Sequence, residues 1–233
     1  FSLFPFESQL LKKHGVNFSY VGHPLAKNLI NDLNEKELRK KFGISSEKKI
    51  IAILPGSRKS EINHHSKPLA DFINQYKKEN SDVEIIVALN KESDLQGELK
   101  ELSKKINVIY NSTQKVLAIC DLAIVASGTA TLEAAILAKP MVVIYKSNKL
   151  SNFILSNFFL KTQFISLPNI LSQEKIVFEL RQNQVTVKEI SEKVELTLKK
   201  QKVISDKLSS IRDSLLVTDS NKFSIALREI LAK

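Results

Sequence analysis

Short apolar runs alternate with longer amphipathic stretches through the first two thirds of the chain. Each run has the length and composition of a strand buried on both faces. The runs lie at 49–54, 83–89, 107–110, 121–126 and 140–145. The stretches between them predict helices at 60–80, 91–105 and 113–119, the first interrupted near Pro68 because proline removes a helical hydrogen bond. Strands that alternate with helices predict an α/β fold with a parallel sheet covered on both faces.

The sequence on either side of this region has a helical character. Before it, helices are predicted at 7–14 and 35–42, separated by an extended segment at 17–21 and a break at Gly22-His23-Pro24. After about residue 170 no further strand pattern is recognised, and helices with charged faces are predicted instead. These lie at 174–182, 187–201, 203–216 and 220–232.

Two of the apolar runs end in loops of small residues that suit an anion. Gly56-Ser57-Arg58 follows the run 49–54, and its guanidinium can form paired hydrogen bonds to a phosphate. Ser127-Gly128-Thr129-Ala130 follows the run 121–126 and opens a helix, whose first N–H groups lack helical partners and carry partial positive charge. Because ligands bind at the carboxyl ends of parallel strands, the two loops together predict a diphosphate site.

Glu133 lies about a turn and a half into the helix that the second loop opens. There its carboxylate can accept hydrogen bonds from both hydroxyls of a ribose, as acidic residues do in other nucleotide-binding folds. Each motif also has a plain structural interpretation. The Gly128 loop can be a tight strand-to-helix turn, and the Gly56 loop can be a surface turn. Glu61 can cap its helix or orient Arg58. The local sequence leaves these alternatives open.

Three further features carry weaker signals. Asn169 follows Leu167-Pro168 and can bind a base, a sugar or the backbone of its own turn. His64 and His65 are adjacent, so a helix directs them about 100° apart, which makes them poor joint ligands and predicts solvent exposure. Phenylalanines gather at 150–165, either as core packing or as an interfacial patch that meets acyl chains.

Composition narrows the classes of partner. A net charge of +10 fits phosphorylated ligands and an anionic membrane surface. The lysines are scattered without interleaved aromatics, so no nucleic acid partner is expected. With Cys120 as the single cysteine and four histidines, there is no metal-site spacing, and no disulfide can form within the chain. That usage is typical of a reducing compartment. No apolar run reaches the length that spans a bilayer.

Five motifs occur in order along the chain. They are Phe4-Pro5-Phe6-Glu7, Val21-Gly22-His23-Pro24-Leu25, Leu54-Pro55-Gly56-Ser57-Arg58 with Glu61-Ile62, Ser127-Gly128-Thr129-Ala130-Thr131-Leu132-Glu133, and Ser166-Leu167-Pro168-Asn169-Ile170-Leu171. In this order and spacing the chain resembles the bacterial lipid-A-disaccharide synthase family. The resemblance covers nearly the whole chain and is least specific after about residue 185.

The resemblance implies the donor-binding half of a two-domain glycosyltransferase-B fold, with a Rossmann-like parallel sheet and a helical C-terminal tail. Members of that family transfer 2,3-diacylglucosamine from UDP-2,3-diacylglucosamine to 2,3-diacylglucosamine 1-phosphate (lipid X). The products are lipid A disaccharide 1-phosphate and UDP, with inversion at the anomeric carbon. The resemblance also implies that no cofactor and no metal are needed, and that the protein is cytoplasmic and peripheral on the inner face of the cytoplasmic membrane.

Residue roles follow from the same resemblance. The implied donor-binding residues are Gly56, Ser57, Arg58, Ser127, Gly128, Thr129, Ala130, Glu133 and Asn169. Among them, Arg58 is the expected catalytic residue, because it would offset charge on the departing UDP. Glu133 would hold the ribose hydroxyls, and Asn169 would line the donor pocket. The general base is expected in an amino-terminal half that this chain does not contain.

Because the chain opens on Phe1 in mid-pattern, we expect a fragment of a longer protein. Residues 1–20 would end the amino-terminal acceptor domain, 21–185 would form the donor-binding domain, and 186–233 would form a helical segment. Two alternatives to this lipid A transferase stay open: a UDP-binding fragment without catalytic activity, and another UDP-sugar enzyme of the same fold. A homodimer is also left open.

Overall fold

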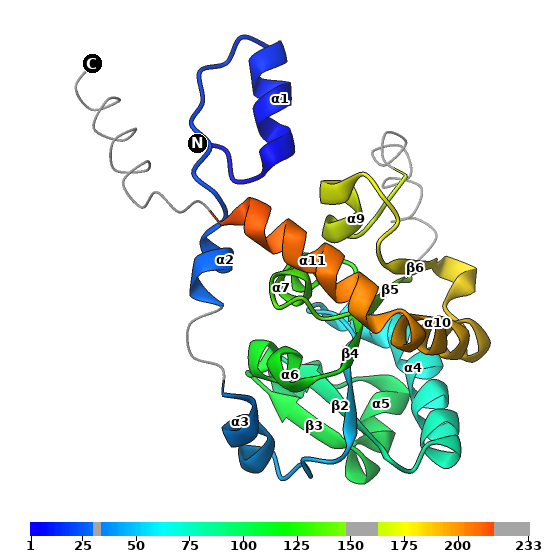
Figure 1. Ribbon diagram of the computed structural model, residues 1–233. Helices are drawn as coiled ribbons and strands as arrows, with labels where there is room; N and C mark the ends of the chain where they lie inside the picture. Colours follow the sequence, from blue (N-terminus) through cyan, green and yellow to red (C-terminus); the bar gives the residue numbers. More distant parts are fainter. Residues whose placement is uncertain (30–33, 148–162, 217–233) are drawn as a thin grey trace.

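A six-stranded parallel sheet forms the middle layer of the molecule, in a computed structural model that describes residues 1–29, 34–147 and 163–216 (Figure 1). Its order is β3-β2-β1-β4-β5-β6. The chain runs from the centre to one edge and then restarts beside its first strand, which leaves a crevice where the two central strands end. The strands are β1 (Lys49–Leu54), β2 (Val83–Leu89), β3 (Asn107–Tyr110), β4 (Leu122–Ala126), β5 (Met141–Tyr145) and β6 (Phe178–Arg181).

Helices cover both faces of this sheet (Figure 1). The α-helices are α1 (Pro5–Lys13), α2 (Pro24–Asn28), α3 (Glu35–Lys41), α4 (Lys59–Glu79), α5 (Gly97–Leu102), α6 (Thr113–Ile119), α7 (Thr129–Ile136), α9 (Leu167–Ser172), α10 (Val187–Lys199) and α11 (Gln201–Leu215). Short 3₁₀ turns are η1 (Glu92–Asp94), η2 (Ser103–Lys105) and η3 (Gln182–Gln184). Helices α4, α5 and α10 pack on one face, and α3, α6, α7 and α11 on the other.

Successive residues of the central strands enter opposite cores. Ile50 and Ala52 of β1 face the α7 side, whereas Ile51 and Ile53 face the α4 side. Both sets are apolar because crossover helices exclude water from both faces of a parallel sheet. In the register of β1 with β4, Leu54 lies opposite Val125. The loops that follow these two strands therefore start at the same level, at one edge of the sheet.

The two helices after residue 186 belong to this packing. Helix α10 places Ile190 and Val194 in the core on the α4 side, and α11 places Leu208 and Ile211 in the core on the α7 side. They are amphipathic covers of the sheet, since their charged faces point to solvent. The boundary predicted at residue 186 stays a prediction.

The segment before β1 is fastened to the far end of α11. The hydroxyl of Tyr20 donates to the carbonyl of Ser214 at 2.6 Å, and the N–H of His23 donates to the carbonyl of Leu215 at 3.1 Å. Helix α1 lies outside the layers on the sheet (Figure 1). Its Phe6 and Leu10 side chains are exposed. The boundary predicted after residue 20 likewise stays a prediction.

The predicted sheet is confirmed. Strands β1, β2 and β3 occupy the predicted residues, and β4 and β5 each begin one residue later than predicted. The helix predicted at 113–119 also has the predicted bounds. The helices predicted at 187–201 and 203–216 correspond to α10 and α11.

Four expectations were wrong. Residues 178–181 form strand β6, not part of a helix over 174–182; charged residues of this edge strand, such as Glu179 and Arg181, hide its apolar signal. Residues 91–105 form η1, α5 and η2 instead of one helix, because Gly97 turns the chain at φ 54° against Ser66. Helix α4 is continuous through Pro68, because its buried face outweighs one lost hydrogen bond. His65 is buried, not solvent-exposed.

Two expectations lie outside the described residues: the helix at 220–232 and most of the phenylalanine-rich segment at 150–165. Across residues 1–29, 34–147 and 163–216, no helix is long and apolar enough to cross a membrane.

Candidate functional site

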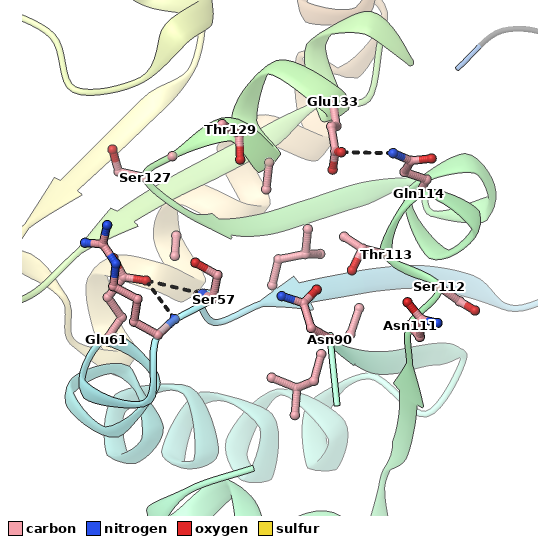
Figure 2. A pocket seen from close by; sticks show the side chains of 18 of the residues that line it. Ser57, Glu61, Asn90, Asn111, Ser112, Thr113, Gln114, Ser127, Thr129 and Glu133 are labelled. Atoms are coloured by element: carbon pink, nitrogen blue, oxygen red, sulfur yellow. Dashed lines mark hydrogen bonds between the residues drawn. The ribbon is translucent and has the colours of Figure 1, made fainter. Parts of the chain in front are cut away.

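A cavity of about 730 Å³ opens at the carboxyl edge of the sheet, over the crevice between β1 and β4 (Figure 2). Three groups of described residues line it. The first is Leu54 and residues 56–58 with Glu61, the second is residues 88–90 with 111–115, and the third is residues 126–130 with Glu133. Both predicted glycine loops therefore face one space, and Glu133 faces it with them.

The loop after β1 is fixed by the first turn of α4. One carboxylate oxygen of Glu61 accepts hydrogen bonds from the N–H groups of Ser57 and Arg58, at 3.2 and 3.3 Å. Gly56 has a φ of 131°, and a Cβ there would meet the same oxygen at 2.9 Å, so only glycine fits. These bonds of Glu61 thus cap the helix, whereas the exposed side chain of Arg58 lies at the cavity.

The loop after β4 places the start of α7 at the opposite wall. Gly128 has a φ of 155°, and a Cβ would meet no atom within 4 Å, so its backbone conformation alone favours glycine. Its carbonyl accepts from both the N–H and the hydroxyl of Thr131, at 3.1 and 2.7 Å. These bonds hold the turn so that the N–H groups of the first helical residues, which have no intrahelical partner, border the cavity.

Ser127 is tied into the protein more closely than the sequence indicated. Its N–H donates to the carbonyl of Ile144 at 2.9 Å, and its hydroxyl donates to the carbonyl of Ile165 at 2.7 Å. Both donors are therefore engaged within the chain, although the residue lines the cavity. Its part in ligand binding stays a prediction, and the hydroxyl oxygen could contribute only as an acceptor.

Glu133 lies at the end of the cavity away from Ser57 and Ser127 (Figure 2). One of its carboxylate oxygens accepts a hydrogen bond from the side-chain amide of Gln114 at 3.0 Å. Gln114 is exposed at the start of α6, so this bond sets the direction of the carboxylate without burying it. A carboxylate held this way can still accept hydrogen bonds through its other oxygen and remaining lone pairs.

A polar wall that the sequence analysis did not identify completes the cavity. It consists of Asn90, after β2, and of residues 111–115, after β3. Figure 2 shows Asn111, Ser112 and Thr113 on the side of Gln114, away from Ser57 and Ser127. Their position after a strand is the sequence signal that could have identified these residues, since the carboxyl ends of parallel strands all lie at the ligand-binding edge of such a sheet. Neither β2 nor β3 is followed directly by a glycine, so these two strand ends carry no loop motif.

Asn169 is not among the described residues that line the cavity. Its side chain is fully buried: its oxygen accepts from the N–H groups of Ile176 and Val177, and its amide donates to Val177 and to Glu179. The structure thus gives Asn169 the role of joining α9 to the segment before β6. A role in lining the donor pocket stays a prediction.

Glu179 organises the segment that leads into α9. Its side chain is 5% exposed and accepts hydrogen bonds from the N–H groups of Ile165 and Ser166, the hydroxyl of Ser166, and Arg181. Burial opposes its ionisation, but the bonds from Arg181, Ser166 and Ile165 outweigh burial and lower the pKa of Glu179. Because Ile165 in turn accepts from Ser127, Glu179 braces the loop after β4.

The described residues hold no group of three or more His, Cys, Asp or Glu side chains arranged to bind a metal ion. The charged side chains around the cavity are Arg58 and Lys115, together with Glu61 and Glu133. Since Glu61 is engaged by backbone N–H groups, Arg58 and the start of α7 make one end of the cavity suitable for an anion.

Comparison with known proteins identifies the family. The family model described as Lipid-A-disaccharide synthetase matches residues 1–230. The chain belongs to the lipid-A-disaccharide synthase family. It is 32% identical over 238 residues to the Lipid-A-disaccharide synthase of Colwellia psychrerythraea, covering 99% of this chain and 60% of the relative. It is 36% identical over 196 residues to that of Albidiferax ferrireducens, covering 82% and 50%. The chain therefore spans only part of the length of these curated relatives.

Solved structures share the fold of this synthase-family chain at low sequence identity. A Methanocaldococcus jannaschii UDP-GlcNAc 2-epimerase, in complex with UDP-GlcNAc and UDP, matches with a TM-score of 0.61 and 14% identity, over 99% of this chain and 60% of that one. WaaG, a glycosyltransferase involved in lipopolysaccharide biosynthesis, matches with a TM-score of 0.54 and 14% identity, over 91% and 57%. These matches confirm the Rossmann-like half of a glycosyltransferase-B type fold.

We expect Glu61→Ala to lower the free energy of unfolding of this synthase-family chain by about 1 kcal/mol, because it removes the cap from Ser57 and Arg58. Glu61→Gln should retain most of the stability, since an amide oxygen still accepts these bonds. Urea denaturation measures both, with Glu47→Ala as an exposed control. An equal loss in Glu61→Ala and Glu47→Ala would contradict the capping role.

The lowered pKa of Glu179 predicts a pH-dependent difference in stability. Its ionised form stabilises the fold fully above the ordinary value of 4.5, and this contribution is lost as pH falls through the lower folded pKa. We therefore expect the free energy of unfolding of wild type to exceed that of Glu179→Gln most at pH 7. This difference should close below about pH 4.5. Denaturant unfolding across this range checks it. A gap independent of pH would show that ionisation of Glu179 contributes nothing.

Proposed function

We propose that this chain forms the donor-binding part of an enzyme that transfers 2,3-diacylglucosamine from UDP-2,3-diacylglucosamine to 2,3-diacylglucosamine 1-phosphate. The observation that carries the proposal is one cavity, at the crevice of a family member, with Arg58 and the start of α7 at one end and Glu133 at the other. Its anion-suited end and its ribose-suited carboxylate match a nucleoside diphosphate.

The contacts of Glu61 indicate how the diphosphate would be held. Because the N–H groups of Ser57 and Arg58 already donate to Glu61, the loop after β1 would act mainly through the Arg58 guanidinium. The N–H groups at the start of α7, from Gly128 to Ala130, would hold the phosphates from the other wall. Glu133 would accept hydrogen bonds from the ribose hydroxyls while Gln114 keeps it in place.

In the proposed reaction, a hydroxyl of the acceptor sugar attacks the anomeric carbon while the bond from that carbon to the UDP oxygen breaks. The acceptor's proton passes to a general base, which we expect in the part of the relatives that this chain does not span. Negative charge grows on the departing diphosphate, and Arg58 with the α7 dipole would stabilise it most at the transition state. Attack from the opposite face inverts the anomeric centre.

The proposed lipid substrates imply work at a membrane surface. The net charge of +10 favours an anionic leaflet, where each nearby Lys or Arg contributes about 1 kcal/mol. We therefore propose a peripheral location on the inner face of the cytoplasmic membrane. A homodimer stays an open proposal.

Two alternatives remain. In the first, the chain binds UDP without catalysing transfer, because it spans only 60% and 50% of the two relatives compared above. In the second, it serves another UDP-sugar enzyme of the same fold. Membership of the lipid-A-disaccharide synthase family favours the transferase over this second alternative.

We expect calorimetric titration of UDP into the chain to show saturable binding that Arg58→Ala weakens about 10- to 100-fold, the worth of a charge-assisted hydrogen bond. Glu133→Ala should weaken it less, and adenosine should compete poorly because it lacks the diphosphate. Lys59→Ala, beside the loop but not lining the cavity, is the matched control. Equal affinity in Arg58→Ala and wild type would contradict the placement of the diphosphate.

Transfer itself can be tested by joining this chain to the amino-terminal part of the Colwellia psychrerythraea relative. We expect the chimera to form the disaccharide, and Arg58→Ala to lower kcat by about 10²- to 10³-fold, as expected for loss of a donor that stabilises developing charge. Thin-layer separation of radiolabelled products measures both. UDP binding without transfer in a folded chimera would favour the non-catalytic alternative.

A further inference from the structure

His65 lies on the second turn of α4 and is 1% exposed, although its neighbour His64 is partly exposed. A buried imidazole loses its hydration, so it is retained at little loss of stability only where both ring nitrogens have partners. Both nitrogens of His65 do. Nδ1 lies 2.7 Å from the carbonyl oxygen of Pro55, and Nε2 lies 2.9 Å from the backbone nitrogen of Lys146.

These two partners determine where the proton resides. The carbonyl of Pro55 can only accept, so Nδ1 must carry a hydrogen, and the N–H of Lys146 can only donate, so Nε2 must present its lone pair. Burial lowers the pKa of His65, which favours this neutral ring. The two backbone groups therefore select one tautomer of one neutral imidazole.

The positions of the two partners give the ring its significance. Pro55 directly precedes Gly56-Ser57-Arg58, and Lys146 directly follows β5. Strands β1 and β5 are not neighbours, since β4 lies between them. The ring therefore links the ends of the two strands that flank the turn from β4 into α7.

Helix α4 thus holds the loop after β1 by two side chains one turn apart. Glu61 binds the N–H groups of Ser57 and Arg58, and His65 binds the carbonyl of Pro55. The loop after β4, which forms the opposite wall of the cavity, is also attached to β5. The N–H of Ser127 donates to the carbonyl of Ile144, two residues before Lys146. A leucine could fill the volume of the ring, but it would leave the carbonyl of Pro55 and the N–H of Lys146 without these bonds.

We propose that His65 is a positioning residue for the nucleoside diphosphate: its imidazole fixes the root of the Pro55–Arg58 loop to the end of β5, and so sets the aim of the Arg58 guanidinium. This inference rests on the proposed function for the identity of the ligand. It adds a residue that lies outside the cavity and acts on the ligand only through the loop.

The test uses the 233-residue chain with His65→Leu, His65→Gln and the matched control His64→Gln. UDP affinity is measured by calorimetry at a temperature where all variants are fully folded by circular dichroism. We expect His65→Leu to raise Kd at least tenfold, and His64→Gln to change it less than twofold. His65→Gln should recover most of the affinity, because one amide can donate to Pro55 and accept from Lys146. Wild-type affinity in folded His65→Leu would overturn the proposal.

A second measurement separates this inference from the proposed function. Amide hydrogen exchange reports the loop without any ligand. In His65→Leu we expect exchange at Lys146 and at the Gly56–Arg58 loop to accelerate at least tenfold, with the interior of β2 unchanged. Unchanged exchange at these sites would overturn the positioning role even if UDP binds. Wild type that fails to bind UDP would contradict the proposed function, while the exchange result would still decide what His65 does to the loop.

If His65→Leu does not fold, nitrogen-15 spectra of the wild-type imidazole test the proposal instead, because they show which ring nitrogen carries the proton. The proposal requires a protonated Nδ1 and an unprotonated Nε2 that persist when UDP is added. A ring protonated at Nε2, or one averaging between tautomers, would overturn it.

Discussion

Burial of the central strands on both faces is the constraint on which the rest of this structure depends. The residues of β4 are all buried, as are those of β1 after Lys49, and alternate side chains enter two different cores. Each large apolar side chain of this kind stabilises the fold by roughly 1.5–3 kcal/mol, so neither strand can slide without opening both cores. Polar chemistry is thereby confined to the strand ends, and the ends of β1 and β4 are held at one level.

That constraint also explains which parts of the fold were predictable. Runs such as 49–54 and 83–89 are apolar at every position except Lys49 and Glu84, so their strand character is local information. Strand β6 needs the neighbouring β5 for its identity, because only Leu180 of its four residues is buried. The break at Gly97 depends on Ser66, which lies 31 positions earlier in the sequence and is brought near by folding. Contacts of this sort leave no periodic trace around the residue concerned.

The residues of the candidate site also divide into those with a local sequence signal and those whose contacts depend on packing. The two glycine loops were recognisable, since strand-to-helix turns with small residues carry a physical signature in a few consecutive positions. The sequence left two roles open for Glu61, capping its helix or orienting the Arg58 side chain. Its hydrogen bonds to the backbone N–H groups of Ser57 and Arg58 are those of a helix cap. By contrast, the hydroxyl of Ser127 donates to the carbonyl of Ile165, and the side-chain amide of Gln114 donates to the carboxylate of Glu133 on another helix. Those pairings arise only from the packing of the sheet, so no inspection of either segment alone reveals them.

The bonds from Tyr20 and His23 to the end of α11 have a mechanical consequence. The segment that approaches β1 meets the end of α11 at one place, where the carbonyls of Ser214 and Leu215 accept those bonds. The segment before β1 and the end of α11 are thereby coupled, so a force on residues 1–19 passes to α11 through these two hydrogen bonds. The walls of the cavity are held by other bonds, from Ser57 and Arg58 to Glu61 and from Ser127 to Ile144, so this coupling does not run through them.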